Sequence, residues 1–150
     1  MTTETYTGGC LCSAIRYEVT GRPIEVGYCH CRMCQKALGS VFGVFAIFAH
    51  HGFRFTKGKP NFYRSSPPKE RSFCPACGSP LTMWNADTGI RRHVAIMLGT
   101  LDQPELFPPA EHAGSHSGIE SAVSWFHVDD GLPRWRTEED PLYIAPGGTV

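Results

Sequence analysis

Three cysteines stand close together in the pattern Cys-x-Cys-x-x-Cys, formed by Cys29, Cys31 and Cys34. Thiolates at this spacing can hold one soft metal ion, and zinc is the usual one. Zinc prefers four ligands in a tetrahedron, so three thiolates leave one position free. A catalytic site gives that position to water or substrate, whereas a structural site closes it with a fourth side chain. The function therefore depends on whether this cluster has a fourth protein ligand.

A second pair of thiols stands in the motif Cys74-Pro-Ala-Cys77, which Gly78 follows. Two thiols at this spacing grip an ion from a tight turn, and glycine tolerates the left-handed backbone that such a turn often needs. This zinc-knuckle pattern supplies only two ligands, and by elimination the other two are Cys10 and Cys12. The four thiols predict a structural zinc that ties the N-terminal strand to the middle of the chain and contributes folding energy.

His30 lies between two of the three clustered cysteines, so we expect its side chain to point away from the ion that they bind. We favour a place beside the metal or in a pocket wall over a direct ligand role. Because the ordinary pKa of histidine lies near neutrality, His30 is also a candidate to shuttle a proton during a reaction. The remaining histidines, with His112 and His116 among them, are interpreted as hydrogen-bonded or surface residues.

Four basic residues could bind a carboxylate of a substrate, although each could equally be a solvated surface charge: Arg32, Lys36, Arg91 and Arg92. The formal net charge of the chain is zero, which argues against a nucleic-acid partner. Seven cysteines cannot all pair in internal disulfides because their number is odd. The chain also shows no signal peptide and no apolar run of about 20 residues, so we expect no membrane span and a reducing, cytoplasmic location. Such a compartment favours metal binding over disulfides.

Short strands separated by Gly and Pro turns predict an all-β chain of antiparallel strands that forms one domain over residues 1–150, with a loose tail from about residue 137. In residues 14–20, Ile15, Tyr17 and Val19 alternate with polar residues and predict one buried face. One short helix is expected over residues 31–38, directly after the three-cysteine cluster, and Gly39 follows it. The further strand candidates are residues 41–48, 53–56, 61–65, 81–85, 91–98 and 122–128, and residues 99–117 are expected to be irregular.

With these motifs in this order, the sequence resembles the glutathione-dependent formaldehyde-activating enzyme family, which also includes centromere protein V-like members. Three segments carry the resemblance, residues 8–12, 29–36 and 71–79, and it covers residues 8 to about 100. The resemblance implies a tent-like, all-β fold related to that of methionine-R-sulfoxide reductases. It also implies two zinc ions per chain, a structural one on Cys10, Cys12, Cys74 and Cys77 and a catalytic one on Cys29, Cys31 and Cys34.

The activity that the resemblance implies is that of a carbon–sulfur lyase, which adds a thiol such as glutathione to formaldehyde or a related small carbonyl compound, or catalyses the reverse reaction. Three ligands hold a metal less firmly than four, so we expect the second zinc to be the more labile ion, at partial occupancy. The alternative is a non-enzymatic, zinc-stabilised module that binds a protein or a small ligand, in which both clusters are structural. The presence or absence of a fourth protein ligand at the three-cysteine cluster distinguishes these two functions.

Overall fold

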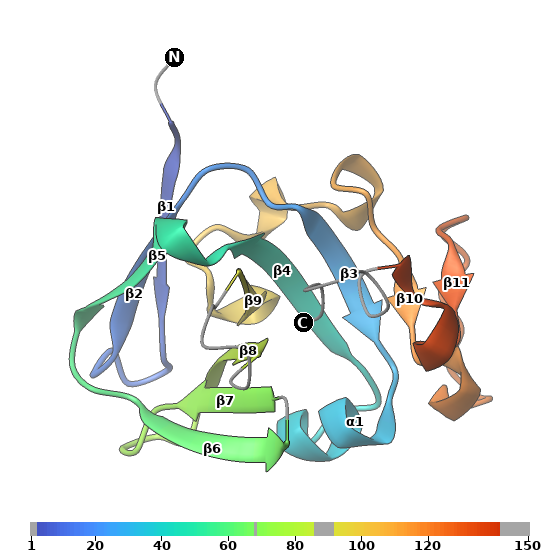
Figure 1. Ribbon diagram of the computed structural model, residues 1–150, viewed down its shortest axis with the longest axis horizontal. Helices are drawn as coiled ribbons and strands as arrows, with labels where there is room; N and C mark the ends of the chain where they lie inside the picture. The colour runs from blue at the N-terminus through green and yellow to red at the C-terminus, as the bar shows by residue number, and fades with distance from the viewer. Residues whose placement is uncertain (1–2, 68, 86–91, 142–150) are drawn as a thin grey trace.

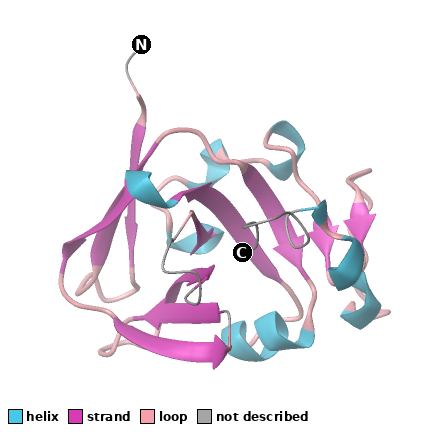
Figure 2. Ribbon diagram, in the orientation of Figure 1, coloured by secondary structure: helices cyan, strands magenta, loops and turns pink. Residues whose placement is uncertain are grey.

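The computed structural model describes residues 3–67, 69–85 and 92–141, and this part of the chain is mostly β (Figures 1 and 2). Its strands form two sheets, and its one α-helix, α1 (Arg32–Leu38), follows the three-cysteine cluster. Cys31 caps the N-terminus of α1, and Gly39 ends the helix in the left-handed conformation with φ of 63°. The all-β class and the short helix predicted from the sequence are therefore confirmed.

The smaller sheet contains three antiparallel strands in the order β1 (Thr5–Gly9), β2 (Arg16–Thr20) and β5 (Phe53–Lys57). Its inner face carries the residues predicted from the alternating pattern, since Tyr17 and Val19 are fully buried. They belong to the main hydrophobic core, which also contains side chains of the larger sheet. The two sheets thus share one core.

The larger sheet has eight strands, in the order β11 (Arg134–Trp135), β10 (His116–Ser117), β3 (Glu25–Cys29), β4 (Gly43–Ala49), β9 (His93–Met97), β8 (Pro80–Asn85), β7 (Lys69–Phe73) and β6 (Asn61–Ser66). Its pairs are antiparallel except for those of β10, which runs parallel to both β3 and β11. The residue register puts His116 beside Tyr28 and Ser117 beside Cys29. A short strand late in the chain therefore lies next to the three-cysteine cluster.

Strand β9 is buried on both faces. Val94 and Ile96 join the main core, whereas Ala95 and Met97 pack on the opposite face in a smaller cluster with Cys34. A central strand covered on both sides needs apolar residues throughout rather than in alternation. This second covered face is the one that carries the three-cysteine cluster.

The described chain after β9 is mainly irregular and contains short 3₁₀ turns, which are η2 (Leu98–Thr100), η3 (Pro104–Leu106), η4 (Pro109–Glu111), η5 (Ile119–Ser121) and η6 (Thr137–Glu139). One further turn, η1 (His50–Gly52), precedes β5. The strand predicted over residues 122–128 is wrong, because this segment joins no sheet and Trp125 in it is 73% exposed. Residues 99–117 are irregular as expected, apart from β10 at their end. Apolar residues alone could not fix a strand here, because a strand needs a partner edge.

None of the described helices is long and apolar enough to cross a membrane. The single domain over residues 1–150 stays a prediction, and so does the loose tail from about residue 137. Residues 142–150 lie outside the described part of the chain, while Asp140 within the predicted tail is buried.

Candidate metal centre and its cavity

The four thiols assigned to a structural zinc converge at the junction of the two sheets. Cys10 and Cys12 follow β1 of the smaller sheet, and Cys74 and Cys77 follow β7 of the larger one. Their Sγ atoms all lie within 4.8 Å of one another, although none forms a disulfide. Two of the separations are 3.6 Å and 3.8 Å, close to the edge of about 3.8 Å in a tetrahedron whose zinc–sulfur bonds are about 2.3 Å. The geometry fits a closed four-thiolate metal site.

Hydrogen-bond donors around the four-thiol cluster favour the thiolate form of its cysteines. Gly78 has φ of +77°, the left-handed conformation expected from the sequence. The hydroxyl and the backbone N–H of Ser79 lower the pKa of Cys77 to about 5. The backbone N–H of Ile15 also donates to Cys10 Sγ at 3.2 Å. Because metal ligation needs the deprotonated thiol, these donors prepare the cluster for an ion.

The three remaining thiols form a second cluster at the end of β3 and the start of α1. The Sγ atoms of Cys29, Cys31 and Cys34 lie within 4.8 Å of one another. Cys31 is the N-cap of α1, and its Sγ accepts from the backbone N–H of Cys34 at 3.4 Å. The pKa of Cys31 is lowered chiefly by hydrogen bonds from Cys29 and Cys34, whereas the pKa of Cys29 is raised chiefly by its own hydrogen bonds with Cys31 and Cys34. Three thiols that share protons in this way are a natural site for a soft cation.

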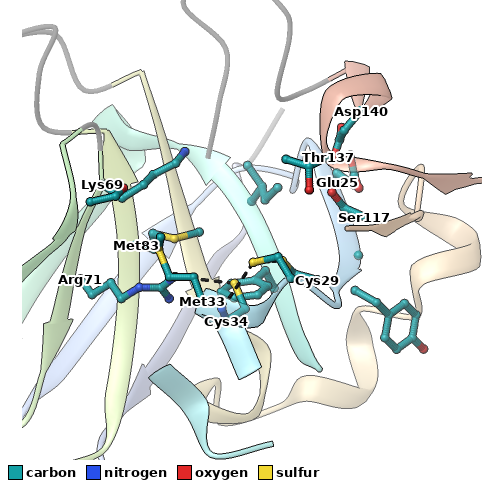
Figure 3. A pocket seen from close by; sticks show the side chains of 16 residues that line it. Glu25, Cys29, Met33, Cys34, Lys69, Arg71, Met83, Ser117, Thr137 and Asp140 are labelled. Atoms are coloured by element: carbon teal, nitrogen blue, oxygen red, sulfur yellow. Dashed lines mark hydrogen bonds between the residues drawn. The ribbon is translucent and has the colours of Figure 1, made fainter. Parts of the chain in front are cut away.

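Among the described residues, no histidine, aspartate, glutamate or further cysteine joins this second cluster as a fourth ligand. The cluster opens instead onto a cavity of about 290 Å³, whose lining includes all three cysteines (Figure 3). Part of the wall is apolar, with Met33, Met83 and two side chains of β4. This volume is near the lower end of the range for small-molecule sites. A metal bound here would keep one coordination position toward the cavity.

Strand β7 forms a basic wall of the cavity. Lys69 and Arg71 lie two residues apart on this strand, so their side chains share one face, and each is only 8% exposed. Arg71 donates to Cys34 Sγ at 3.6 Å through Nη2 and to Ser65 Oγ at 3.1 Å through Nε. Burial lowers the pKa of Lys69 to about 8. The cluster is thus flanked by two largely desolvated cations.

The opposite wall is acidic and hydroxyl-bearing, with Glu25 and Asp140 beside Ser117 and Thr137 (Figure 3). Glu25 accepts a hydrogen bond of 2.7 Å from the hydroxyl of Ser115, and burial raises its pKa. Asp140 is 8% exposed. The cavity therefore has basic side chains on its β7 side and acidic side chains on the opposite side.

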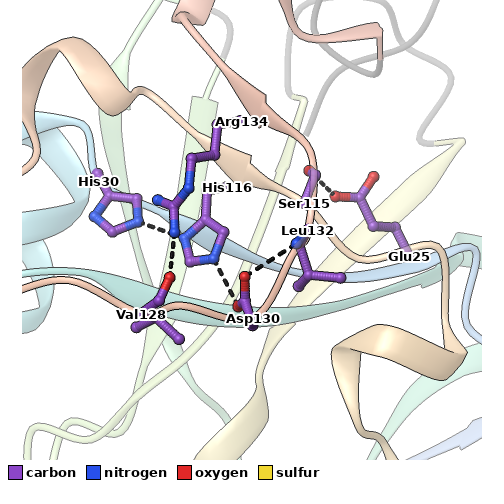
Figure 4. A network of polar contacts seen from close by, with 8 residues as sticks. All are labelled: Glu25, His30, Ser115, His116, Val128, Asp130, Leu132 and Arg134. Atoms are coloured by element: carbon purple, nitrogen blue, oxygen red, sulfur yellow. Dashed lines mark hydrogen bonds and ion pairs between the residues drawn. The ribbon is translucent and has the colours of Figure 1, made fainter.

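His30 belongs to a hydrogen-bonded chain of three side chains, with His116 and Asp130 (Figure 4). Its Nε2 lies 2.8 Å from Nδ1 of His116, and Nε2 of His116 lies 2.9 Å from the carboxylate of Asp130. Because a carboxylate accepts, His116 donates from Nε2 and, when neutral, accepts at Nδ1 from His30. His30 is neither in the thiol cluster nor among the cavity lining residues, and burial lowers its pKa.

Several of the residues that shape the cavity and its surroundings were not predicted from the sequence. Arg32, Lys36 and Arg92, which the sequence offered either as carboxylate ligands or as surface charges, are exposed and do not line the cavity. Arg91 lies outside the described residues. The cations that do line it, Lys69 and Arg71, stand at alternating positions just before the zinc knuckle. That spacing on a strand was the available signal. The pairing of His116 with His30 had no comparable signal, because β10 brings them together from 86 residues apart.

The fold and its thiols define a β protein with two candidate metal centres, one closed between its sheets and one open to a cavity. The sequence profile of the glutathione-dependent formaldehyde-activating enzyme family matches residues 5–115, and the chain belongs to this family. No curated protein matches the chain at a significant level. The crystal structure of a Rhodobacter sphaeroides protein superposes with a TM-score of 0.55 at 16% identity, over 86% of this chain and 98% of that one. At this identity, the likeness shows the fold alone.

Proposed function

We propose that the protein is a zinc-dependent carbon–sulfur lyase that adds a thiol such as glutathione to formaldehyde or a related small carbonyl compound, or catalyses the reverse. Family membership supports a glutathione-related, formaldehyde-activating role. The observation that carries the proposal is the three-thiol cluster, which lacks a fourth ligand among the described residues and opens onto the cavity. A scaffold with two structural ions would close both clusters.

In the proposed reaction, the sulfur of the thiol forms a bond to the carbonyl carbon, and the carbon–oxygen double bond becomes a single bond. The thiol proton ends on the new hydroxyl group, so no oxidant or reductant is needed. Zinc, when bound, would offer its fourth position to the substrate sulfur and favour the thiolate at neutral pH. Without such help only a few per cent of an ordinary thiol is ionised.

The residues of the chain would prepare this site in three ways. Cys29, Cys31 and Cys34 would hold the ion, with the helix cap supporting the thiolate of Cys31. Three thiolates and one divalent ion carry a net negative charge, which Arg71 reduces by its hydrogen bond to Cys34. The apolar side chains, among them Met33 and Met83, would exclude water from the carbonyl compound.

A proton-shuttle role for His30 remains part of the proposal. Its tautomer, fixed through His116 and Asp130, leaves Nδ1 as the basic nitrogen. Because His30 does not line the cavity, a proton exchanged with the substrate would pass through an intervening water or polar group. The cytoplasmic location and the choice of zinc over other soft metals are likewise proposed.

The test is the rate of formation and cleavage of the adduct between glutathione and ¹³C-labelled formaldehyde, followed by NMR exchange on protein with measured zinc content. Addition without enzyme is the background that must be subtracted. We expect acceleration by the wild type and loss of it in Cys31→Ala, with the Cys10-Cys12-Cys74-Cys77 cluster still loaded. A zinc-loaded protein that binds glutathione without accelerating either direction would favour the binding-module function instead.

A further inference from the structure

Nitrogen atoms of the basic wall are buried without using their hydrogen-bonding capacity. Lys69 Nζ and Arg71 Nη1 both have no hydrogen-bond partner among the described residues, although each side chain is more than nine-tenths buried. Both side chains lie on the cavity face of β7, as Figure 3 shows. A buried donor without an acceptor is costly to keep, above all on an ammonium group, so these two unused donors point to a ligand that completes their hydrogen bonds.

Compensation of the thiolate charge does not account for both cations. Arg71 hydrogen-bonds to Cys34 through Nη2 and so serves the cluster directly. The ammonium of Lys69 has no such contact with a thiol. Arg71 also has Nη1 left over after its bonds to Cys34 and Ser65. The unused donors are therefore the ammonium of Lys69 and the Nη1 group of Arg71, two residues apart on one strand. Such a pair of donors suits a carboxylate.

The opposite wall determines which way an anionic ligand would lie. Glu25 and Asp140 face the cavity from β3 and from the segment after η6, on the far side from β7 (Figure 3). Their carboxyl groups disfavour a ligand carboxylate on that side. An anion that enters the cavity is thus directed to β7, and the thiol cluster lies between the two walls.

We infer that Lys69 and Arg71 form an anion subsite that binds a carboxylate of the substrate thiol, so that the substrates are carboxylate-bearing thiols rather than neutral ones. This inference rests on the proposed function. The ammonium of Lys69 and the free Nη1 of Arg71 donate to the carboxylate oxygens, while the substrate sulfur is directed to the three-thiol cluster. The subsite sets both the orientation of the thiol and the discrimination against uncharged thiols of the same size.

Binding of matched pairs of small thiols to zinc-loaded protein tests the subsite. The probes are 3-mercaptopropionate and 4-mercaptobutyrate, each compared with its own primary amide, which has the same shape and no charge. Isothermal titration calorimetry gives the ratio of the two dissociation constants. We expect the wild type to bind at least one acid ten times or more tightly than its amide. Lys69→Met should reduce this ratio below about three, and Lys69→Arg should retain most of it.

Lys59→Met is the matched control, because Lys59 is an exposed lysine in the turn between β5 and β6. It should leave the ratio of acid to amide unchanged. If Lys69 acted only as a counter-ion of the cluster, Lys69→Met would weaken acid and amide by the same factor, and the inference would be overturned. Equal binding of acid and amide by the wild type, or binding of neither, would also overturn it. Acid preference without turnover of formaldehyde would instead preserve the subsite and reject the lyase activity.

Discussion

Arg71 Nη2 lies 3.6 Å from the Sγ atom of Cys34, so the strand that leads to one thiol cluster also contacts the other. The same strand, β7, ends next to Cys74 of the four-thiol cluster. A short stretch of chain thereby connects the four-thiol cluster, the three-thiol cluster and the basic wall of the cavity. The consequences of this connection can be tested residue by residue.

Replacement of Arg71 by methionine should weaken metal binding at the three-thiol cluster, because Cys34 loses the donor that reduces the negative charge of its sulfur. Outer-shell contacts of this kind change metal affinity by about 10- to 100-fold. In competition with a chromophoric chelator, Arg71→Met should release one zinc per chain more readily than the wild type does. The release of the other zinc should be the same in both proteins. Arg54→Met is the control, since Arg54 is exposed on the smaller sheet. Identical release curves for wild type and Arg71→Met would contradict the prediction.

Loss of a four-thiol ligand should damage the fold, whereas loss of a three-thiol ligand should not. Cys77→Ala removes a ligand at the junction of the two sheets and is expected to give insoluble or strongly destabilised protein, since structural zinc contributes folding energy directly. Cys29→Ala should stay folded and bind about one zinc per chain in place of two. Metal analysis and thermal unfolding measure both effects. A soluble Cys77→Ala protein with the melting temperature and zinc content of the wild type would refute the assignment.

Lys69 should make the stability of the protein depend on pH in the alkaline range. Burial, with Arg71 next, lowers its pKa from 10.5 to about 8 in the folded protein, while Cys34, Cys29 and Asp140 act in the opposite direction. Between these pKa values the unfolded chain binds more protons than the folded one, so stability rises with pH. From pH 7 to pH 9 the wild type should gain about 1 kcal/mol relative to Lys69→Met.

Zinc-loaded protein suits this measurement, because metal-bound thiols do not titrate in the same range. Urea unfolding at the two pH values gives the free energies. Lys69→Met should also be the more stable protein at pH 7, since it removes a buried unpaired charge. Parallel pH profiles for the two proteins would mean that the ammonium is better solvated than the structure shows.

The His30–His116–Asp130 chain should stabilise the region around the three-thiol cluster. His116 is fully buried, and the hydrogen bond from its Nε2 to Asp130 is lost in Asp130→Ala. We expect a loss of about 1 kcal/mol in the free energy of unfolding, because Asp130 is partly exposed. Asp129→Ala, next to it and exposed, is the control. A loss of the same size in the control would show that the hydrogen bond between His116 and Asp130 does not stabilise the protein specifically.

The two thiol clusters could be predicted from the sequence largely because the spacing of cysteines is a local property. Cys29, Cys31 and Cys34 lie on a few consecutive residues, and the knuckle at Cys74 and Cys77 is one turn. The alternation around Tyr17 likewise predicted a buried face, because the direction of side chains on a strand has a period of two. These features need no knowledge of distant contacts.

The sequence did not reveal the cavity or its polarity, because both depend on which strands become neighbours. Lys69 and Glu25 line the same cavity, although β4, β9 and β8 lie between β3 and β7 in the sheet. His116 meets His30 through a parallel pairing that no local pattern specifies. The sequence by itself determined which thiols form the two clusters and the β class. Only the tertiary structure decided that one cluster stays open, and that two cations share its cavity, because those properties follow from burial between strands far apart in the chain.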